Sequence, residues 1–333
     1  MRRITINNLK RRNNCYQHTM KHRKWFLALL FVILWGGDLT AQQDAMYSQY
    51  MFNGLILNPA YAGSRDGISV VGLLRRQWVS IPGAPQTETI SAHGNSRNER
   101  FGFGASIIND RISFLSQTWY NACYSYRIPL RKGNLALGLQ GTLYNFRVRW
   151  EDAYTIDPND NVVNTYAQNL LLPNVGFGMY YSTDRGYIGA SVPHMLIHSL
   201  DRGRPKVSFF NIGDDLPGLY QHYFLTAGYV IDINSNIKFK PSMLVKYHRT
   251  SPIQFDLNAT LFWYNRLWTG VSYRTRDGMV AMVEYQFNRM LRAGYAYDYP
   301  FTQLNNFTAA SHEIMLGFDL DFRKDASVSP RFF

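Results

Sequence analysis

The chain has 333 residues, with 35 Lys and Arg against 23 Asp and Glu, which gives a formal net charge of +12. Eight of the bases and one of the acids lie in residues 1–41, so the remainder carries only about +5 and has no dense basic cluster of the kind that binds nucleic acid. Cys123 is the single cysteine after position 41, which excludes an intramolecular disulfide there, and no later apolar stretch is long enough to span a bilayer as a helix.

Residues 1–41 are predicted to be a cleaved signal peptide. A basic stretch at 21–24 precedes the uninterrupted apolar run 25–35, and Ala41 offers a small residue at the expected cleavage point. This order of basic, apolar and small residues is typical of secretory signals, and the apolar run is too short for a spanning helix. Met20 is a candidate for the true start codon. An uncleaved anchor helix is the alternative interpretation.

The rest of the chain is predicted to form two parts. Residues 42–65 are too irregular for a strand, and we expect an N-terminal segment that plugs a barrel lumen or lies at its periplasmic rim. Residues 66–333 alternate between apolar and polar side chains, as strands with two different faces do. In the last of these strands, Ile314 and Leu316 would point to one face, and Glu313 would point to the other.

The fold class is therefore predicted to be all-β, an antiparallel transmembrane β-barrel of about 14 strands, with 12 and 16 as alternatives. A soluble propeller or sandwich is the competing fold. A propeller would repeat a motif every 40–50 residues or so, and the sequence contains no such repeat. The predicted strands are 66–76, 86–94, 100–109, 116–128, 134–148, 174–182, 186–193, 220–232, 237–247, 254–264, 267–276, 279–287, 290–298 and 312–322.

Connections between these strands fall into two classes. If the first strand begins in the periplasm, the inner connections are all short, and the long segments 150–172, 194–217 and 299–311 are all on the outer side. Outer-membrane barrels show this asymmetry.

Charged residues on the strands are expected to face the lumen, because a charge on the lipid face costs about 2–4 kcal/mol at the midplane. Pro241 lies within the predicted strand 237–247, where proline cannot donate a ladder hydrogen bond, and we expect a bulge there. The predicted lumen-facing bases are Lys238, Lys240, Lys246 and Arg274.

Residues 47–63 read Tyr-Ser-Gln-Tyr-Met-Phe-Asn-Gly-Leu-Ile-Leu-Asn-Pro-Ala-Tyr-Ala-Gly. This stretch resembles the start of the PorP/SprF family of Bacteroidetes type IX secretion membrane proteins, and the similarity continues along the chain. Gly54 departs from the Pro that is typical of the family. The residues that carry the resemblance are Asn58, Pro59, Ala60, Tyr61, Ala62 and Gly63, followed by Arg76, Gln77, Trp78, Gly83, Ala84 and Pro85.

The resemblance implies an outer-membrane barrel that works with the type IX secretion and gliding machinery. Members of the family often serve the secretion or surface attachment of one large adhesin, so the implied partners are type IX components, a large client protein and outer-membrane lipid. The motif has two interpretations. It is either a structural entry to the barrel, in which Pro59 keeps Asn58 extended, or a surface that docks a partner. Trp78 is interpreted as an aromatic of the membrane interface.

No catalytic, cofactor or metal site is predicted. His194 and His198 have i,i+4 spacing, which could place two ligands on one helical face, but no HExxH motif includes them. The chain contains no G-x-S-x-G motif, no phosphate-binding loop and no dinucleotide-binding motif. We therefore expect a protein that is not an enzyme, with no cofactor and no small-molecule substrate.

Two functions remain open at this point. A secretion accessory would dock its client, and we favour the outer loops 150–172 and 194–217 as the place, because binding residues concentrate on loops held by a rigid scaffold. A passive porin or small-solute channel would instead conduct ions, and its lumen-facing bases would favour anions.

Overall fold

The computed structural model shows a chain built mainly of β-strands. It divides into two units, and the larger one, residues 43–249 and 253–333, contains the barrel. The predicted signal peptide lies outside the described residues. Among the described residues, no helix is both long and apolar enough to cross a bilayer. The structure describes residues 47–65, 67–149, 169–201, 204–208, 218–219, 221–248, 251–302 and 308–320.

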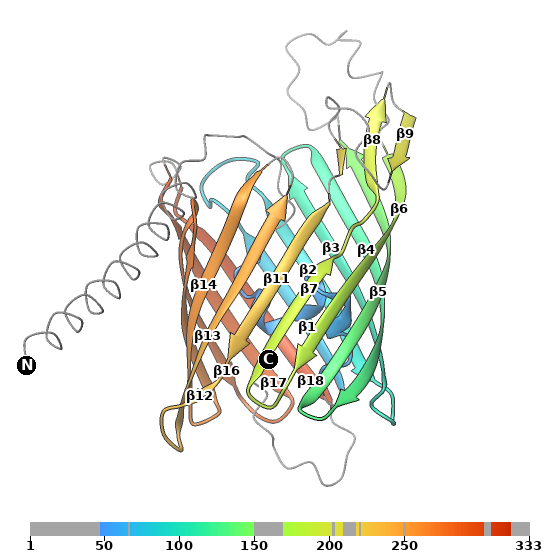
Figure 1. The fold of residues 1–333 in the computed structure, drawn as a ribbon. Helices are drawn as coiled ribbons and strands as arrows, with labels where there is room; N and C mark the ends of the chain where they lie inside the picture. Colours follow the sequence, from blue (N-terminus) through green and yellow to red (C-terminus); the bar gives the residue numbers. More distant parts are fainter. Residues whose placement is uncertain are drawn as a thin grey trace, which may run out of the picture. The chain divides into compact units, whose positions relative to one another are not determined.

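A closed antiparallel barrel is the main element of the fold (Figure 1). Its sheet has fifteen strand segments, but β11 and β12 pair with β13 in one continuous register, so they form one strand and the barrel has fourteen, as predicted. The first and last strands, β1 and β18, pair with each other and close the barrel.

The strands of the barrel are β1 (Ile68–Arg76), β2 (Gln86–Asn95), β3 (Phe101–Ile112), β4 (Leu115–Leu130), β5 (Gly133–Val148), β6 (Asn169–Ser182), β7 (Gly186–Val192), β11 (His222–Tyr229), β12 (Ile231–Asp232), β13 (Ile237–His248), β14 (Ser251–Trp263), β15 (Leu267–Arg274), β16 (Gly278–Gln286), β17 (Leu291–Pro300) and β18 (Ser311–Leu320).

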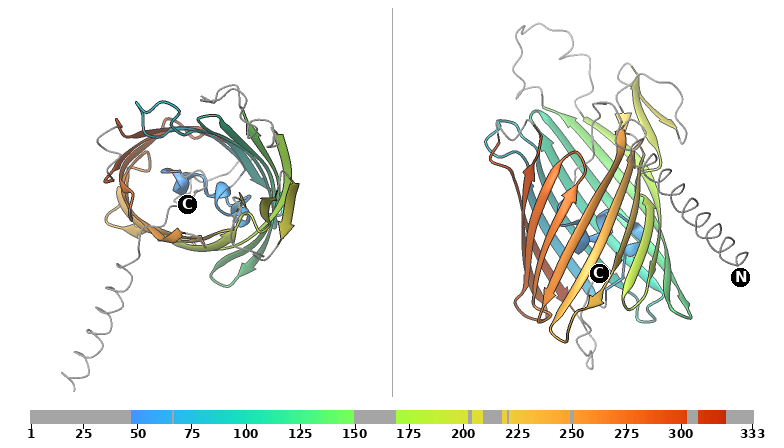
Figure 2. Two further views of the ribbon diagram at one scale, coloured as in Figure 1. Left: turned by 90° about the horizontal axis from the view of Figure 1, so that it is seen from above. Right: turned by 60° about the vertical axis from the view of Figure 1, so that its left-hand side comes forward.

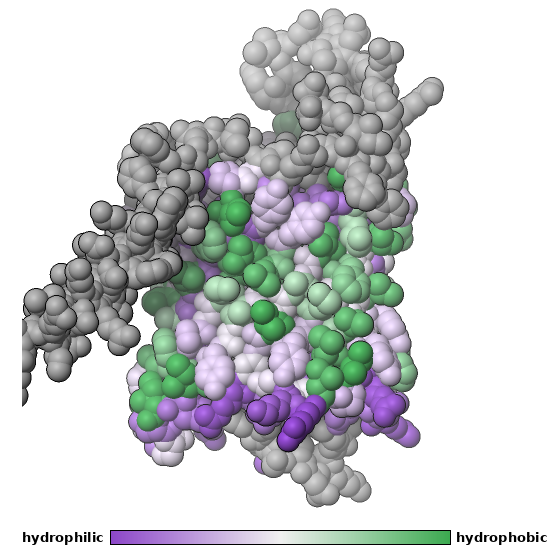
Figure 3. Space-filling view, in the orientation of Figure 1, coloured by the Kyte–Doolittle hydropathy of each residue, from purple (hydrophilic) through white to green (hydrophobic). Residues whose placement is uncertain are grey.

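Side chains alternate between a lipid face and a lumenal face. In β18, Ile314 is 53% exposed and Leu316 is 58% exposed, whereas Glu313 and Met315 are 1% and 0% exposed. Apolar residues cover much of the outer surface between the two ends of the barrel (Figure 3). This arrangement follows from the cost of placing polar groups against lipid, which directs inward the charged side chains that lie away from the strand ends.

The two ends of the barrel differ in their connections. At one end, which we call the inner end, six turns of two to five residues join the strands. The other end, the outer end, carries the long connections and a separate three-stranded sheet, whose β8–β9 hairpin rises above the barrel (Figure 1). Short turns mark the periplasmic side of outer-membrane barrels. The three strands are β8 (Ile197–Asp201), β9 (Arg204–Ser208) and β10 (Gly218–Leu219).

Pro241 lies in β13 without the predicted bulge on the side that faces β11 and β12. Ser242 pairs with Gly228, and Phe239 pairs with Ile231 in the same register, so no extra residue separates the two pairs. The prediction of a bulge was wrong at this edge. The pairing is interrupted between these positions instead, because proline has no N–H to donate.

All fourteen predicted strands overlap an observed strand, and the differences of more than two residues lie at the outer end. β6 begins at Asn169, five residues before the predicted start. The run of leucines at 170–172 does not alternate, and Pro173 follows it, so the pattern did not indicate a strand. Pairing with β5 holds this stretch extended. The small sheet was also missed, because it lies in a segment predicted as loop.

The exposed outer face predicts a depth-dependent cost for charge. Replacing Leu316, in the middle of β18, by arginine should lower the free energy of unfolding in lipid vesicles by about 2–4 kcal/mol. The measurement is urea unfolding followed by tryptophan fluorescence. Ile68→Arg is the matched control, because this exposed residue lies at the end of β1, where the cost falls to about 0–1 kcal/mol. Equal losses in the two variants would contradict the assigned lipid face.

Candidate functional site

Residues 47–65, which we call the lumenal segment, lie inside the barrel (Figure 2). They form three short 3-10 turns, η1 (Tyr50–Phe52), η2 (Gly54–Ile56) and η3 (Pro59–Tyr61), and nearly all of them are buried. Turns this short have little stability of their own. Contacts with the barrel wall therefore hold the segment in place.

Asn58 and Pro59 together begin η3. The Asn58 side-chain oxygen accepts a hydrogen bond from the N–H of Ala60 at 2.9 Å, which caps the turn. Pro59 occupies the first position, where its fixed φ is suitable and its missing N–H is not needed. The Asn58 amide nitrogen donates to the carbonyl of Met179 on β6 at 2.9 Å. A single side chain thus starts the turn and ties it to the wall.

Glycines in the wall allow the backbone of this motif to approach the strands. A Cβ on Gly138 of β5 would overlap the backbone of Pro59 and Ala60. A Cβ on Gly178 of β6 would overlap the side-chain oxygen of Asn58. A strand glycine often marks such a close approach of two backbones. The wall and the motif are therefore matched in shape.

The end of the motif is held near the inner end of the barrel. The carbonyl of Ala62 accepts hydrogen bonds from the Ser125 hydroxyl at 2.7 Å and from the Arg127 side chain at 3.2 Å. The N–H of Gly63 donates to Nδ1 of His93 at 3.1 Å. Gly63 has a φ of 68°, in the left-handed region that glycine adopts at little cost. The chain then turns toward β1.

Glu313 holds the opposite end of the lumenal segment. Its two carboxylate oxygens accept hydrogen bonds from the backbone N–H groups of Ser48 and Gln49, each at 2.8 Å. Arg75 lies 3.1 Å from this carboxylate and 2.9 Å from the carboxylate of Asp298. Glu313 and Arg75 are both 1% exposed. Charge-assisted hydrogen bonds of this kind are stronger than neutral ones.

Asp298 connects this anchor to a second group of charges. Arg274 lies 3.1 Å from Asp298, 2.8 Å from Asp277 and 3.4 Å from Asp256. Lys246 lies 2.7 Å from the same Asp256 carboxylate. The predicted lumen-facing bases Lys246 and Arg274 are thus buried and paired with acids.

A further set of ion pairs holds the inner end of the segment. Arg65 lies 3.3 Å from Asp319 of β18, and Arg292 of β17 lies 3.5 Å from the same carboxylate. Arg292 also lies 3.2 Å from Glu284 of β16. The lumenal segment is consequently attached by charges at both of its ends and by backbone contacts in its middle.

The other two predicted lumen-facing bases differ from each other. The ammonium group of Lys240 is buried and lies 5.6 Å from the centre of the Phe262 ring. The side chain of Lys238 is 20% exposed, near the inner end, and lies 3.2 Å from Asp232. The four bases therefore do not line one open passage.

The second family motif lies at the outer end, away from the lumenal segment. Arg76 is exposed at the end of β1, and the N–H of Gln77 donates to the carbonyl of Pro85 at 3.0 Å. Trp78 has a φ of 47°, and its N–H donates to the Ser311 hydroxyl at 3.1 Å. These contacts shape the loop between β1 and β2. Gly83 and Ala84 belong to the same loop.

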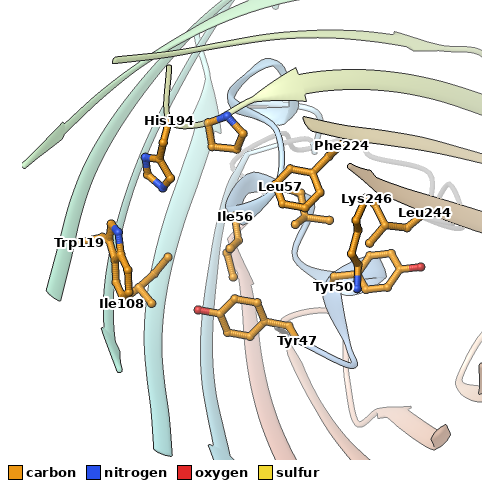
Figure 4. A pocket seen from close by; sticks show the side chains of 11 residues that line it. Tyr47, Tyr50, Ile56, Leu57, Ile108, Trp119, His194, Phe224, Leu244 and Lys246 are labelled. Atoms are coloured by element: carbon orange, nitrogen blue, oxygen red, sulfur yellow. The ribbon is translucent and has the colours of Figure 1, made fainter. Parts of the chain in front are cut away.

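A largely apolar cavity separates the lumenal segment from part of the wall (Figure 4). The cavity is small, with a volume of about 50 Å³. His194 lies at its edge, and the side chain of His198 is outside the described residues. Among the described residues, no group of three or more His, Cys, Asp or Glu side chains could hold a metal ion. The cavity is lined by Tyr47, Tyr50, Ile56, Leu57, Ile108, Trp119, Pro193, His194, Phe224, Leu244 and Lys246.

Sequence reasoning missed the groups that anchor the lumenal segment. Glu313 was identified only as a residue of the polar face, and Gly138 and Gly178 were not singled out. A glycine at an inward position of a strand is a usable signal of close backbone approach. The partner of Glu313, in contrast, lies more than 260 residues away along the chain, and only the register of the sheet reveals it.

Comparison with known proteins gives a family match. Residues 39–318 match the family described as type IX secretion system membrane protein PorP/SprF. No curated protein matches the chain.

Several solved structures are similar to this chain at low sequence identity. A Pseudomonas aeruginosa FadL homologue is 14% identical, with 86% of this chain and 96% of that chain covered and a TM-score of 0.45. The CymD monoaromatic hydrocarbon channel is 13% identical, with 83% and 93% covered and a TM-score of 0.47. Omp33 of Acinetobacter baumannii is 10% identical, with 77% and 98% covered and a TM-score of 0.41.

The glycine contact predicts a position-specific effect on β5. Gly138→Ala would place a methyl group against the backbone of η3, so we expect a loss of about 1–3 kcal/mol in the free energy of unfolding. Gly141→Ala is the control, because nothing lies within 4 Å of a Cβ at that position, and we expect a change within about 0.5 kcal/mol. Urea unfolding in vesicles measures both. A similar response at the two positions would contradict the close approach.

The carboxylate anchor predicts a second effect. Glu313→Gln removes a buried charge that faces Arg75 and the N–H groups of Ser48 and Gln49. We expect a loss of about 3 kcal/mol, at the low end of the range for breaking a buried pair, because Asp298 still faces Arg75. Glu88→Gln, at a partly exposed carboxylate of β2, is the control. If the two variants unfold at the same urea concentration, Glu313 does not anchor the segment.

Proposed function

Because the chain belongs to the PorP/SprF family of type IX secretion system membrane proteins, we propose that it assists the secretion or surface attachment of one large client protein. It acts as a non-enzymatic outer-membrane barrel, alongside type IX components and the gliding machinery. Residues 1–41 serve as the cleaved signal peptide that directs it to the envelope.

The occupied lumen is the observation that supports a docking role over passage of solutes. The lumenal segment is bonded to β1, β4, β6, β7 and β18, through residues that include Arg75, Ser125, Ser191 and Glu313. A segment fixed at so many points obstructs the passage between the two ends. The family motif Asn58 to Gly63 therefore has a structural role in this proposal, as the part of the segment that fits the wall.

The outer end is the place where we expect the client to bind. Its long connections and the β8–β9 hairpin are held by a rigid barrel, which is the arrangement that favours binding loops. The apolar cavity between the lumenal segment and the wall also favours protein binding over passage of solutes, because an aqueous channel would be lined by polar groups. Arg76 and the β1–β2 loop lie at this end as well.

A passive small-solute channel is the alternative. The bases Lys238, Lys246 and Arg274 inside the barrel would favour anions if the lumen conducted. Their pairing with Asp232 and Asp256 weakens this possibility, since the neighbouring acids offset the positive charge.

The first experiment compares surface and medium proteins of a deletion strain with those of its parent. We expect one large secreted protein to be lost from the surface, or a few, while other cargo remains. Purified protein in planar bilayers should show no stable conductance. Removal of residues 47–62 should open a conducting lumen, provided that the variant keeps the heat-dependent gel mobility of a folded barrel.

The two functions give opposite results. An unchanged exported proteome, together with stable conductance of the parent protein, would reject the secretion role and favour the channel. Loss of a client without any parental conductance supports the accessory role. A Gly138→Leu variant offers a second way to displace the segment if the deletion does not fold.

A further inference from the structure

The six turns of the inner end carry an excess of basic side chains. Residues 96–100, 131–132, 183–185, 233–236, 264–266 and 287–290 contain seven bases and two acids. Arg185 pairs with Asp232, but the other six bases are exposed and form no ion pair with another described residue. We call these six residues the inner ring. They are Arg97, Arg100, Arg131, Lys132, Arg266 and Arg289.

The outer end has no comparable set in the described part of the chain. Outside the small β8–β10 sheet, its described connections contain two bases, Arg149 and Arg276, and one acid, Asp277. The outer connection between β5 and β6 contributes acids at the sequence level, because residues 150–168 contain four and no base, and the longer connection 193–221 has three of each. The basic excess is therefore a property of the inner end and not of loops in general.

Exposed aromatic residues lie beside the inner ring on the lipid face. Tyr264 is 69% exposed at the end of β14, and Phe103 and Phe287 are both 56% exposed near inner turns. Aromatic side chains of this kind mark the level of the lipid headgroups. Figure 3 shows hydrophilic residues gathered at this end, next to the apolar surface. The basic side chains thus lie at the height of the phosphate groups.

We propose that the inner ring binds anionic phospholipid headgroups of the periplasmic leaflet. Arginine presents a fork of N–H donors that matches phosphate oxygens, and long basic side chains reach from an apolar surface to the headgroup region. Several bases at the edge of one leaflet attract anionic lipid cooperatively through the negative surface potential. This inference concerns the lipid around the barrel and is independent of the proposed role in secretion.

The distribution of the inner ring favours lipid over a protein partner. Its six members lie on four turns, between β2 and β3, β4 and β5, β14 and β15, and β16 and β17. These turns extend from β14 through β18 and β1 to β5, and only the neighbouring turns β6–β7 and β12–β13 have no member, so the charges follow most of the barrel's inner edge, where a leaflet would contact it. A protein partner would instead be expected to contact bases gathered on one side.

The test measures which lipid stays bound to the purified full-length chain. The protein is placed in mixed micelles with equal phosphatidylglycerol and phosphatidylcholine, and retained lipids are counted by native mass spectrometry. We expect about fivefold enrichment of phosphatidylglycerol, which corresponds to the attraction of about 1 kcal/mol between one base and an anionic surface. The enrichment should fall as salt is raised, because exposed charges are screened.

Two variants separate the inner ring from other bases. Replacing all six members by glutamine should remove the enrichment. Arg266→Gln with Arg289→Gln should reduce it, whereas Arg111→Gln with Arg147→Gln, exposed bases near the outer end, should leave it unchanged. Heat-dependent gel mobility shows whether each barrel is folded. If the sixfold variant does not fold, the Arg266→Gln with Arg289→Gln variant provides the test.

Equal retention of the two lipids by the parent would overturn the proposal, as would unchanged enrichment in the folded inner variants. Cross-linking in whole cell envelopes tests whether the inner ring binds a periplasmic protein instead of lipid. If the sixfold variant loses a cross-linked periplasmic protein and the parent shows no lipid preference, the inner ring is a protein-docking surface and the lipid assignment is wrong.

Discussion

Every backbone N–H and C=O group that crosses the bilayer must find a partner within the protein, because lipid offers none. In this chain the pairing of β1 with β18 meets that requirement, since it leaves no open edge in the sheet. Closure then separates two environments with different demands. Apolar side chains face lipid, and the charged and polar side chains of the same strands are directed into a confined lumen.

The lumen and the segment that fills it depend on each other. Buried charges such as Arg75 and Glu313 are costly unless they are paired and hydrogen-bonded. The backbone N–H groups of Ser48 and Gln49 provide part of that pairing. In return, a stretch with no stable secondary structure of its own acquires a fixed conformation. Gly102, Gly138 and Gly178 remove the side chains that would keep it away from the wall.

The two ends of the barrel are specialised in different ways. The outer end combines long connections, a protruding hairpin and an apolar cavity, which suits a surface that receives a protein. The inner end combines short turns, exposed aromatic residues and six bases that form no ion pair with another described residue, which suits contact with a charged leaflet. The lumenal segment lies between them. Hydrogen bonds to Arg75 and Glu313 hold its outer half, and the ion pair of Arg65 with Asp319 holds its inner end. The proposed functions therefore concern the two surfaces more than the interior.

Alternation in the sequence predicted the barrel and about 14 strands, with 12 and 16 left open, because a two-residue period encodes which face meets lipid. With the first strand taken to begin in the periplasm, the strand pattern also placed the long connections on one side. The motif from Asn58 to Gly63 likewise identified the family. Only the tertiary structure decided what that motif touches, which acids meet Lys246 and Arg274, and where Pro241 interrupts a ladder without a bulge. The contacts of the motif join parts that are distant along the chain, such as Asn58 and Met179, whereas the ion pairs of Lys246 and Arg274 join nearby strands whose register had to be known. A local pattern cannot specify them, because register and closure set which side chains share the lumen.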